Sequence, residues 1–166
     1  MGSGLPHAIG AAYASIGGNI YCFIGDGSMQ FNIQELATIK FLELPIKIIL
    51  INNGGYRAIK DTQDNFFDRR FGVDIATGIS FPSYKEIARA YEIEYCHINT
   101  DNDVLPSLNL ITTDSSPYIC EVFVDPDSSL LPRAGFVKLE DGSTARLPTY
   151  DMFPTIPRDQ MKRYIP

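Results

Sequence analysis

Hydrophobic residues along this chain follow two kinds of pattern. Apolar runs at residues 20–24 and 46–51, the second interrupted only by Lys47, predict two buried strands. Between them, apolar residues recur at spacings near three and four, which predicts a helix that Pro45 ends. A strand, a helix and a strand form a βαβ unit, whose right-handed crossover makes both strands parallel. The apolar positions of the helical pattern are Phe31, Ile33, Leu36, Ala37, Ile39 and Leu42.

Helices and strands are expected to alternate through most of the chain. A helix over residues 83–91 has Ser83 as its N-cap and Glu86 three residues on, a capping box. This alternation predicts an α/β fold, a mostly parallel sheet flanked by helices. The other expected elements are a helix from His7 to about Ile16, a short helix and loop over 56–70, strands at 94–98 and 118–124, and a helix near 104–111.

The C-terminal part differs in composition. Six of the eleven prolines lie after residue 125, which predicts an extended tail rather than a second core. A chain of 166 residues is long enough for one domain with a proper core. We therefore expect a domain at 1–125 and an extended tail at 126–166 that packs on it.

Two polar motifs follow the two strands of the βαβ unit. Gly25-Asp26-Gly27 comes directly after the first strand, and Asn52-Asn53 after the second. Both emerge at the carboxyl edge, where open α/β sheets bind ligands. Gly25 and Gly27 let a ligand approach the backbone, Ser28 supplies a hydroxyl and an amide, and the following helix points free N–H groups there. The arrangement favours a phosphate group.

An acidic side chain at a phosphate site implies a cation between them. Mg²⁺ takes about one or two carboxylates together with phosphate oxygens. Asp26 supplies the carboxylate, and the Asn53 amide oxygen and a carbonyl of the Gly54-Gly55 turn can complete the protein's ligands.

The order of these motifs resembles a known signature. Gly25-Asp26-Gly27, then 24 residues, then Asn52-Asn53 is similar to the thiamine-diphosphate and Mg²⁺ signature of the thiamine-dependent 2-keto acid enzymes, the acetolactate synthase-like group. Five fixed positions at one spacing match by chance about once in a million starts. The resemblance implies a thiamine-diphosphate-binding fold of the PP type that lacks its first strand, with Asp26, Asn53 and the Gly55 carbonyl as metal ligands. Asn52 is expected to hold the loop.

The N-terminal residues carry a second part of the resemblance. The segment 1–11 is similar to the M-G-x-G-L-P-x-A-I-G-A segment of these enzymes, which flanks the rings of the cofactor. Met1 would be the apolar support that keeps the cofactor bent. The domain opens earlier in the family, so Met1 is expected to be an internal methionine or an imposed start. The cofactor-binding residues that the resemblance implies are Met1, Gly2, Ser3, Gly25, Asp26, Gly27, Ser28, Asn53, Gly55 and Tyr56.

The resemblance also implies an activity and partners. The expected substrate is a 2-keto acid, which the enzyme decarboxylates, joins to an acceptor carbonyl, or both. No catalytic residue is expected in this chain, because the activating glutamate lies on a pyrimidine-binding domain or subunit. Glu35 is expected to be structural. A site shared between subunits implies a homo-oligomer, a dimer or a tetramer.

One segment departs from the family. Where acetolactate synthases carry G-M-V-x-Q-W-Q, residues 57–63 read R-A-I-K-D-T-Q. Ala58 and Thr62 stand where those enzymes have a methionine and a tryptophan, and these smaller side chains predict a wider or differently shaped substrate pocket. Arg57 has two readings, a partner for a substrate carboxylate or a solvated surface arginine.

Composition narrows the classes of function further. The net charge is −6, and no basic run exists to bind a nucleic acid. No apolar run approaches the ~18 residues of a membrane span. Three widely spaced cysteines, Cys22, Cys96 and Cys120, favour free buried thiols. We therefore expect a cytoplasmic protein without nucleic-acid or membrane partners.

Two alternatives to a cofactor-binding enzyme domain stay open. The chain can be a non-catalytic remnant that folds or dimerises as an interaction module. It can also bind another phosphate ligand, such as a nucleotide, although no dinucleotide fingerprint or P-loop is present.

Overall fold

The computed structural model describes residues 1–15, 17–67, 69–128 and 131–161. The chain divides into two compact units, Met1–Asp127 and Ser128–Pro166.

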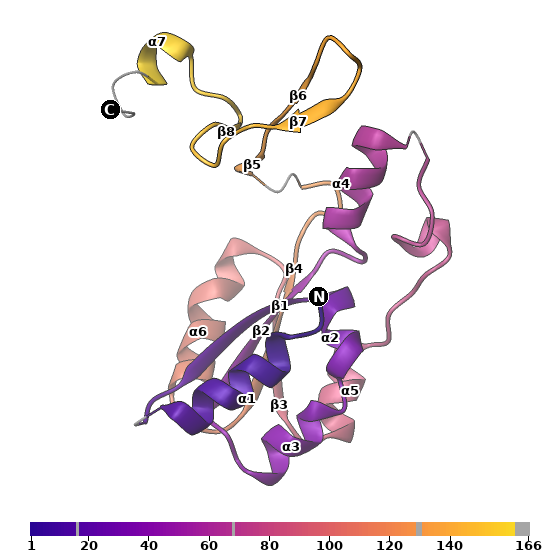
Figure 1. Cartoon of the computed structure of the whole chain (residues 1–166). Coiled ribbons are helices and arrows are strands. Elements are labelled where there is room, and N and C mark those ends of the chain that lie inside the picture. The colour runs from indigo at the N-terminus through magenta and orange to yellow at the C-terminus, as the bar shows by residue number, and fades with distance from the viewer. Residues whose placement is uncertain (16, 68, 129–130, 162–166) are drawn as a thin grey trace. The chain divides into compact units, whose positions relative to one another are not determined.

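A parallel sheet of four strands forms the centre of the first unit (Figure 1). Its order is β1-β2-β4-β3, so β2 and β4 are the inner strands. The sequence of β2 is apolar except for Lys47 and Asn52, which is typical of a strand covered on both faces, and its first five residues are buried, Lys47 among them. The strands are β1 Ile20–Gly25, β2 Ile46–Asn52, β3 Glu94–Ile98 and β4 Tyr118–Phe123.

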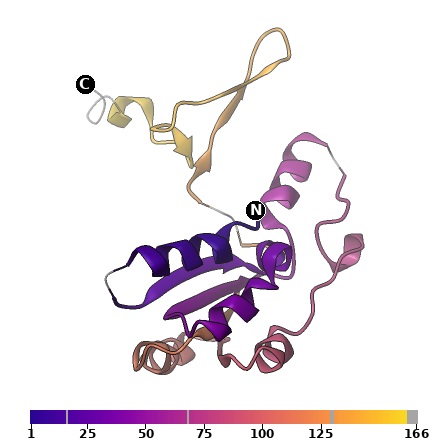
Figure 2. The same ribbon diagram turned by 60° about the horizontal axis from the view of Figure 1, so that its bottom comes forward.

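Helices pack on both faces of this sheet (Figures 1 and 2), but one face of β1 is left uncovered. Buried residues of α1, α3 and α5 pack on one face, and α6 packs on the other. The helices of the first unit are α1 Gly4–Ala14, α2 Asp26–Met29, α3 Glu35–Phe41, α4 Arg57–Phe66, α5 Tyr84–Ala90 and α6 Val104–Thr112, with 3-10 turns at Gln30–Asn32, Ile75–Thr77 and Asp101–Asp103.

The α/β class, the parallel sheet and its four strands are confirmed. Ser83 is the N-cap of α5, and its hydroxyl accepts a hydrogen bond from the Glu86 N–H. The expected start of α1 at His7 is wrong, because the helix begins at Gly4 and tolerates Pro6 in its first turn, where no intrahelical donor is needed. The expected C-terminal residue Ile16 lies outside the described residues.

The helix predicted between β1 and β2 is not continuous. It consists of the single turn α2, a 3-10 turn and α3. A one-turn helix has only a few aligned peptide dipoles, so the macrodipole contributes less to an anion site than a long helix would. The backbone amides at the start of α2 remain the local donors.

The second unit contains two small antiparallel sheets. Strands β6 and β7 form a hairpin around Asp141-Gly142, where Gly142 has φ +83° and the Asp141 carboxylate accepts the Ser143 N–H over 2.8 Å. The hairpin is local structure that proline content does not predict. Packing of this tail on the first unit stays a prediction. The elements are β5 Arg133–Ala134, β6 Phe136–Lys138, β7 Thr144–Arg146, β8 Met152–Phe153 and α7 Arg158–Met161.

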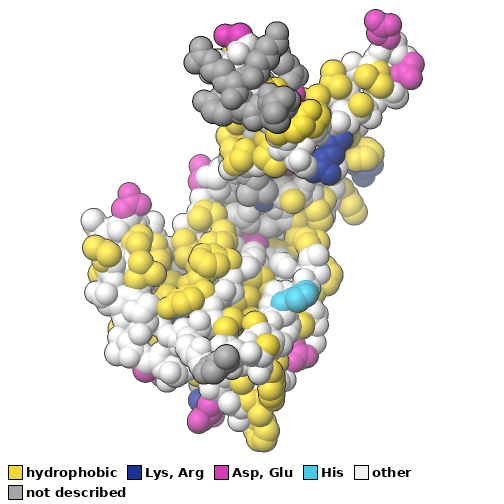
Figure 3. Space-filling view, turned by 60° about the vertical axis from the view of Figure 1, so that its left-hand side comes forward, with side chains coloured by type: hydrophobic (Ala, Val, Ile, Leu, Met, Phe, Trp, Pro, Cys, Tyr) yellow, Lys and Arg dark blue, Asp and Glu magenta, His cyan; other side chains and the backbone are white. Residues whose placement is uncertain are grey.

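Several large hydrophobic side chains are exposed on the first unit (Figure 3). Tyr21 and Phe23 of β1 are 45 % and 72 % exposed. They lie on the face of β1 opposite Cys22, which belongs to the core. The cysteines Cys22, Cys96 and Cys120 are free, as predicted, but only Cys22 and Cys120 are buried, and Cys96 is half-buried. Within the described ranges, no helix has the length and apolar character needed to cross a membrane.

Candidate functional site

The two polar motifs meet at the carboxyl edge of the sheet. Strands β1 and β2 are parallel neighbours with Gly25 opposite Ile51. Asp26 therefore follows β1 beside the point where Asn53 follows β2. The Gly55 N–H donates to Asp26 Oδ2 over 3.0 Å and connects the motifs directly. The expected juxtaposition is formed.

Asp26 is a buried carboxylate at the start of α2. Only 1 % of the residue is exposed. Its Oδ1 accepts the Gly27 N–H over 2.7 Å, and its Oδ2 accepts the Gly55 N–H. Burial raises the pKa of Asp26, and these backbone hydrogen bonds oppose the rise only in part. No lysine or arginine of the described chain forms an ion pair with it. A buried acid without a cationic partner fits a bound metal ion.

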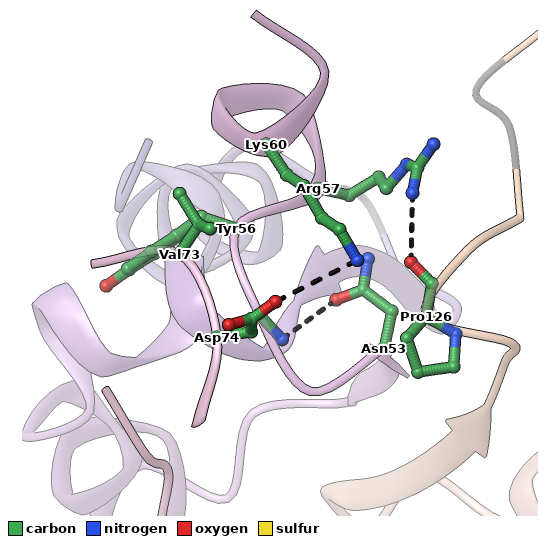
Figure 4. A pocket seen from close by; sticks show the side chains of 8 residues that line it. Asn53, Tyr56, Arg57, Lys60, Val73, Asp74 and Pro126 are labelled. Carbon is green, nitrogen blue, oxygen red and sulfur yellow. Dashed lines mark hydrogen bonds and ion pairs between the residues drawn. The ribbon is translucent and has the colours of Figure 1, made fainter. Parts of the chain in front are cut away.

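The loop after β2 brings Asn53 to the same place. Asn53 Oδ1 accepts the Gly55 N–H over 3.3 Å. A narrow cavity of about 10 Å³ is lined by Asn53, Gly55, Val73 and Asp74, among other residues (Figure 4). That volume corresponds to roughly one water molecule.

Two cationic side chains of α4 lie near this loop (Figure 4). Lys60 is 7 % exposed and pairs with Asp127 over 2.8 Å and with Asp74 over 3.8 Å. Arg57 pairs with Asp61 over 2.7 Å and donates to the Pro126 carbonyl over 3.0 Å. The reading of Arg57 as a solvated surface residue is wrong, since its side chain is only 13 % exposed. Both cations are neutralised within the chain.

Two glycines of the site are required by the packing of the chain itself. A Cβ on Gly27 would lie 2.2 Å from the Tyr56 ring. A Cβ on Gly55 would lie 2.3 Å from the Val73 carbonyl oxygen, which also accepts the Tyr56 N–H. The Tyr56 ring packs edge-on against Phe81 with centroids 5.6 Å apart. Gly27, Gly55 and Tyr56 thus form one close-packed contact.

Gly25 differs from these two glycines. Its φ of −78° suits any residue, and nothing lies within 4 Å of an added Cβ. No contact of the described chain requires glycine at this position.

The N-terminal segment reaches the same site. The Gly2 N–H donates to Ser28 Oγ over 2.8 Å, and the Gly2 carbonyl accepts from Asn32 over 2.8 Å. Gly2 is buried with φ +87°, a conformation that favours glycine. Met1 and Ser3 are exposed on either side of it. The structure therefore brings the predicted residues from both parts of the sequence together.

The sequence did not indicate three supporting groups. The Tyr84 hydroxyl donates to the Asp26 carbonyl over 2.7 Å. The Val73 carbonyl packs on Gly55, and Glu121 accepts from Asn52 over 2.6 Å. These residues lie far from the motifs in sequence, and no local pattern marks them. Asn52 also accepts the Gly54 N–H over 3.0 Å, so it holds the loop as predicted.

The protein offers few metal-ligating groups at this site. The described ranges contain no cluster of three or more His, Cys, Asp or Glu side chains that would hold a metal alone. The predicted set has one carboxylate, one amide oxygen and one carbonyl, so Mg²⁺ would need further oxygens from a ligand. A diphosphate supplies such oxygens.

The sequence of residues 1–122 matches the family described as "Thiamine pyrophosphate enzyme, C-terminal TPP binding domain". The chain belongs to this family. Its relatives include the acetolactate synthase isozyme 1 large subunit of Escherichia coli (strain K12), 37 % identical over 132 residues, which are 80 % of this chain and 23 % of that protein. The acetolactate synthase large subunit of Lactococcus lactis subsp. lactis (strain IL1403) is 32 % identical over 137 residues, 80 % of this chain and 22 % of that protein.

A solved structure shows a similar fold. The thiamine diphosphate-dependent 4-hydroxybenzoylformate decarboxylase of Rhodococcus jostii RHA1 superposes with a TM-score of 0.68 at 27 % sequence identity. The match covers 78 % of this chain and 24 % of that one. This TPP-binding domain therefore spans about a quarter of the length of the proteins that it resembles, which include both synthases and a decarboxylase.

Proposed function

We propose that this TPP-binding domain holds the diphosphate of thiamine diphosphate through Mg²⁺, as part of an enzyme that decarboxylates a 2-keto acid or joins it to an acceptor. The buried Asp26 carboxylate carries the proposal. It lies where both motifs meet, accepts two backbone N–H groups and has no cationic side-chain partner among the described residues.

Each part of the site would have its own role. Asp26, the Asn53 side-chain oxygen and the Gly55 carbonyl would hold Mg²⁺. When bound, the cofactor supplies a carbon nucleophile that attacks the ketone and accepts the electron pair left by carbon dioxide. The residues proposed to contact the cofactor are Met1, Gly2, Ser3, Gly25, Asp26, Gly27, Ser28, Asn53, Gly55 and Tyr56.

Activation of the cofactor would need a partner. We place the activating glutamate on a pyrimidine-binding domain or subunit, which also implies an oligomer. The exposed Tyr21 and Phe23 support a partner surface, because β1 is an edge strand of the described sheet and its aromatic face is uncovered. A cytoplasmic location stays a prediction.

Thermal unfolding tests the proposed ligand. Thiamine diphosphate with Mg²⁺ should raise the melting temperature, since a ligand at about 100 times its Kd stabilises by roughly 2.7 kcal/mol. EDTA should remove the shift because the diphosphate then lacks its bridge to Asp26. Stabilisation by ATP or NAD but not by thiamine diphosphate would show a different phosphate ligand. A chain that binds but supports no decarboxylation after a pyrimidine-binding domain is added would be a remnant.

The substitution Gly25→Ala separates ligand approach from folding. Because an added Cβ meets nothing within 4 Å and φ is ordinary, the ligand-free variant should melt at or slightly above the wild-type temperature. If the diphosphate approaches the backbone here, Mg²⁺-dependent affinity for thiamine diphosphate should fall by about tenfold or more. Calorimetric titration measures this affinity. An unchanged affinity would show that Gly25 does not contact the cofactor.

A further inference from the structure

A glutamate is buried on an inner strand of the sheet. Glu121 of β4 is 4 % exposed and lies in register with Leu50 of β2. Burying a carboxylate is costly, and apolar residues of similar volume are often equally or more stabilising at such positions. Stability alone therefore does not account for an acid at this position.

Both oxygens of this carboxylate accept hydrogen bonds from neighbouring strands. Asn52 Nδ2 donates to Glu121 Oε1 over 2.6 Å, and the Tyr95 hydroxyl donates to Oε2 over 2.5 Å. Because Glu121 Oε1 is the acceptor of this bond, the Asn52 amide turns its NH₂ group towards Glu121. Glu121 thereby fixes the orientation of an amide that could otherwise flip.

The fixed orientation directs the other end of the amide to the loop after β2. Asn52 Oδ1 accepts the Gly54 N–H over 3.0 Å. The next N–H, that of Gly55, donates to Asp26 Oδ2 over 3.0 Å and to Asn53 Oδ1 over 3.3 Å. Short polar contacts therefore run from the buried glutamate to the residues that would hold the metal.

We propose that Glu121 is a positioning residue for the metal site, which acts through Asn52 to hold Asn53 and Gly55 in place. The inference rests on the proposed function and assigns a role to a residue 69 positions beyond Asn52. Partners that orient metal ligands typically change metal affinity by 10–100-fold when they are removed.

The test is a double-mutant cycle on the full chain. The quantity measured is the Mg²⁺ concentration for half-maximal binding of thiamine diphosphate, with Glu121→Leu, Asn52→Ala and the double variant. Each single substitution should raise it by about tenfold or more. The Mg²⁺ concentration that the double variant needs should be within about twofold of that of the single variant with the higher requirement. Both substitutions break the same connection, so their effects should not add. Glu121→Gln should show a smaller rise, since its amide oxygen can still accept from Asn52.

Cys120→Ala is the matched control. Cys120 is the neighbouring residue on β4, is 1 % exposed and packs on the opposite face with Ile111. The Cys120→Ala substitution should lower the melting temperature without changing the Mg²⁺ concentration needed for half-maximal binding. If Glu121→Leu does not fold, Glu121→Gln and Tyr95→Phe take its place. Each is then combined with Asn52→Ala in the same kind of cycle to test whether Glu121 acts through Asn52.

The outcomes separate two failures. If wild-type binding does not depend on Mg²⁺, or Asp26→Asn binds as wild type does, the proposed function is wrong. If those results hold but the Glu121 variants need no more Mg²⁺ than Cys120→Ala, or the effects of Glu121 and Asn52 substitutions multiply, only the positioning role is wrong.

Discussion

Asp26→Asn is expected to weaken Mg²⁺-dependent binding of thiamine diphosphate by more than about 100-fold, beyond the 10–100-fold typical of residues that only orient ligands. The substitution keeps the shape of the side chain but removes the negative charge that Mg²⁺ needs beside the diphosphate. It also replaces one acceptor oxygen by an NH₂ group. Either the Gly27 or the Gly55 N–H then loses its partner at the carboxylate, although Gly55 also donates to Asn53.

That loss has a cost in folding which must be separated from binding. An unsatisfied buried donor costs about 1–3 kcal/mol, so the ligand-free variant should also melt lower. Binding is therefore measured by calorimetry well below both melting temperatures, with Asp26→Ala alongside. Glu94→Gln removes an exposed acid at the start of β3 and should leave affinity unchanged. Wild-type affinity in Asp26→Asn would rule out Asp26 as the metal ligand.

Gly55→Ala is expected to lower both the stability of the first unit and its affinity for the cofactor. The new Cβ would lie 2.3 Å from the Val73 carbonyl oxygen, and both atoms belong to the backbone or are fixed to it. Relief requires the loop or the segment around Val73 to move, which breaks the bridge between Gly55 and Asp74. Overpacking of this kind costs about 1–3 kcal/mol. The displaced Gly55 carbonyl would also weaken Mg²⁺ binding, by about tenfold or more.

Denaturant unfolding and calorimetric titration of this variant measure the two effects separately. Gly10→Ala is the control, because Gly10 is exposed in α1 and an added Cβ meets nothing within 4 Å. It should stabilise the chain by about 0.5–1 kcal/mol, since alanine loses less conformational freedom in a helix. A Gly55→Ala chain as stable as Gly10→Ala would show that the contact with Val73 is easily relieved.

The relatives of this chain are several times longer than the chain itself. The domain covers 23 % of a synthase relative and 24 % of a decarboxylase. We therefore expect substrate choice to depend on parts outside the shared region, and a role of residues 57–63 in the substrate pocket stays a prediction. Within residues 57–63, the guanidinium group of Arg57 is already paired with Asp61 and with the Pro126 carbonyl.

The sequence by itself determined the α/β class, the parallel βαβ unit and the meeting of Asp26 with Asn53. These follow from local rules, because largely apolar runs make strands and the crossover has one hand. The expectation that both strands are buried holds for β2 but not for β1, whose Tyr21 and Phe23 are exposed. The positions of the strands from Glu94 to Phe123 follow from the same patterns.

Only the tertiary structure decided what supports the site. Glu121, Tyr84 and Val73 come from elements distant in sequence, and their contacts depend on sheet order and on packing between layers. The hydrogen bond from Arg57 to the distant Pro126 carbonyl was likewise decided by the tertiary structure. Hydrophobic periodicity reports which face of an element is buried. It does not report which distant polar group that face will meet, because that choice is made when the layers pack.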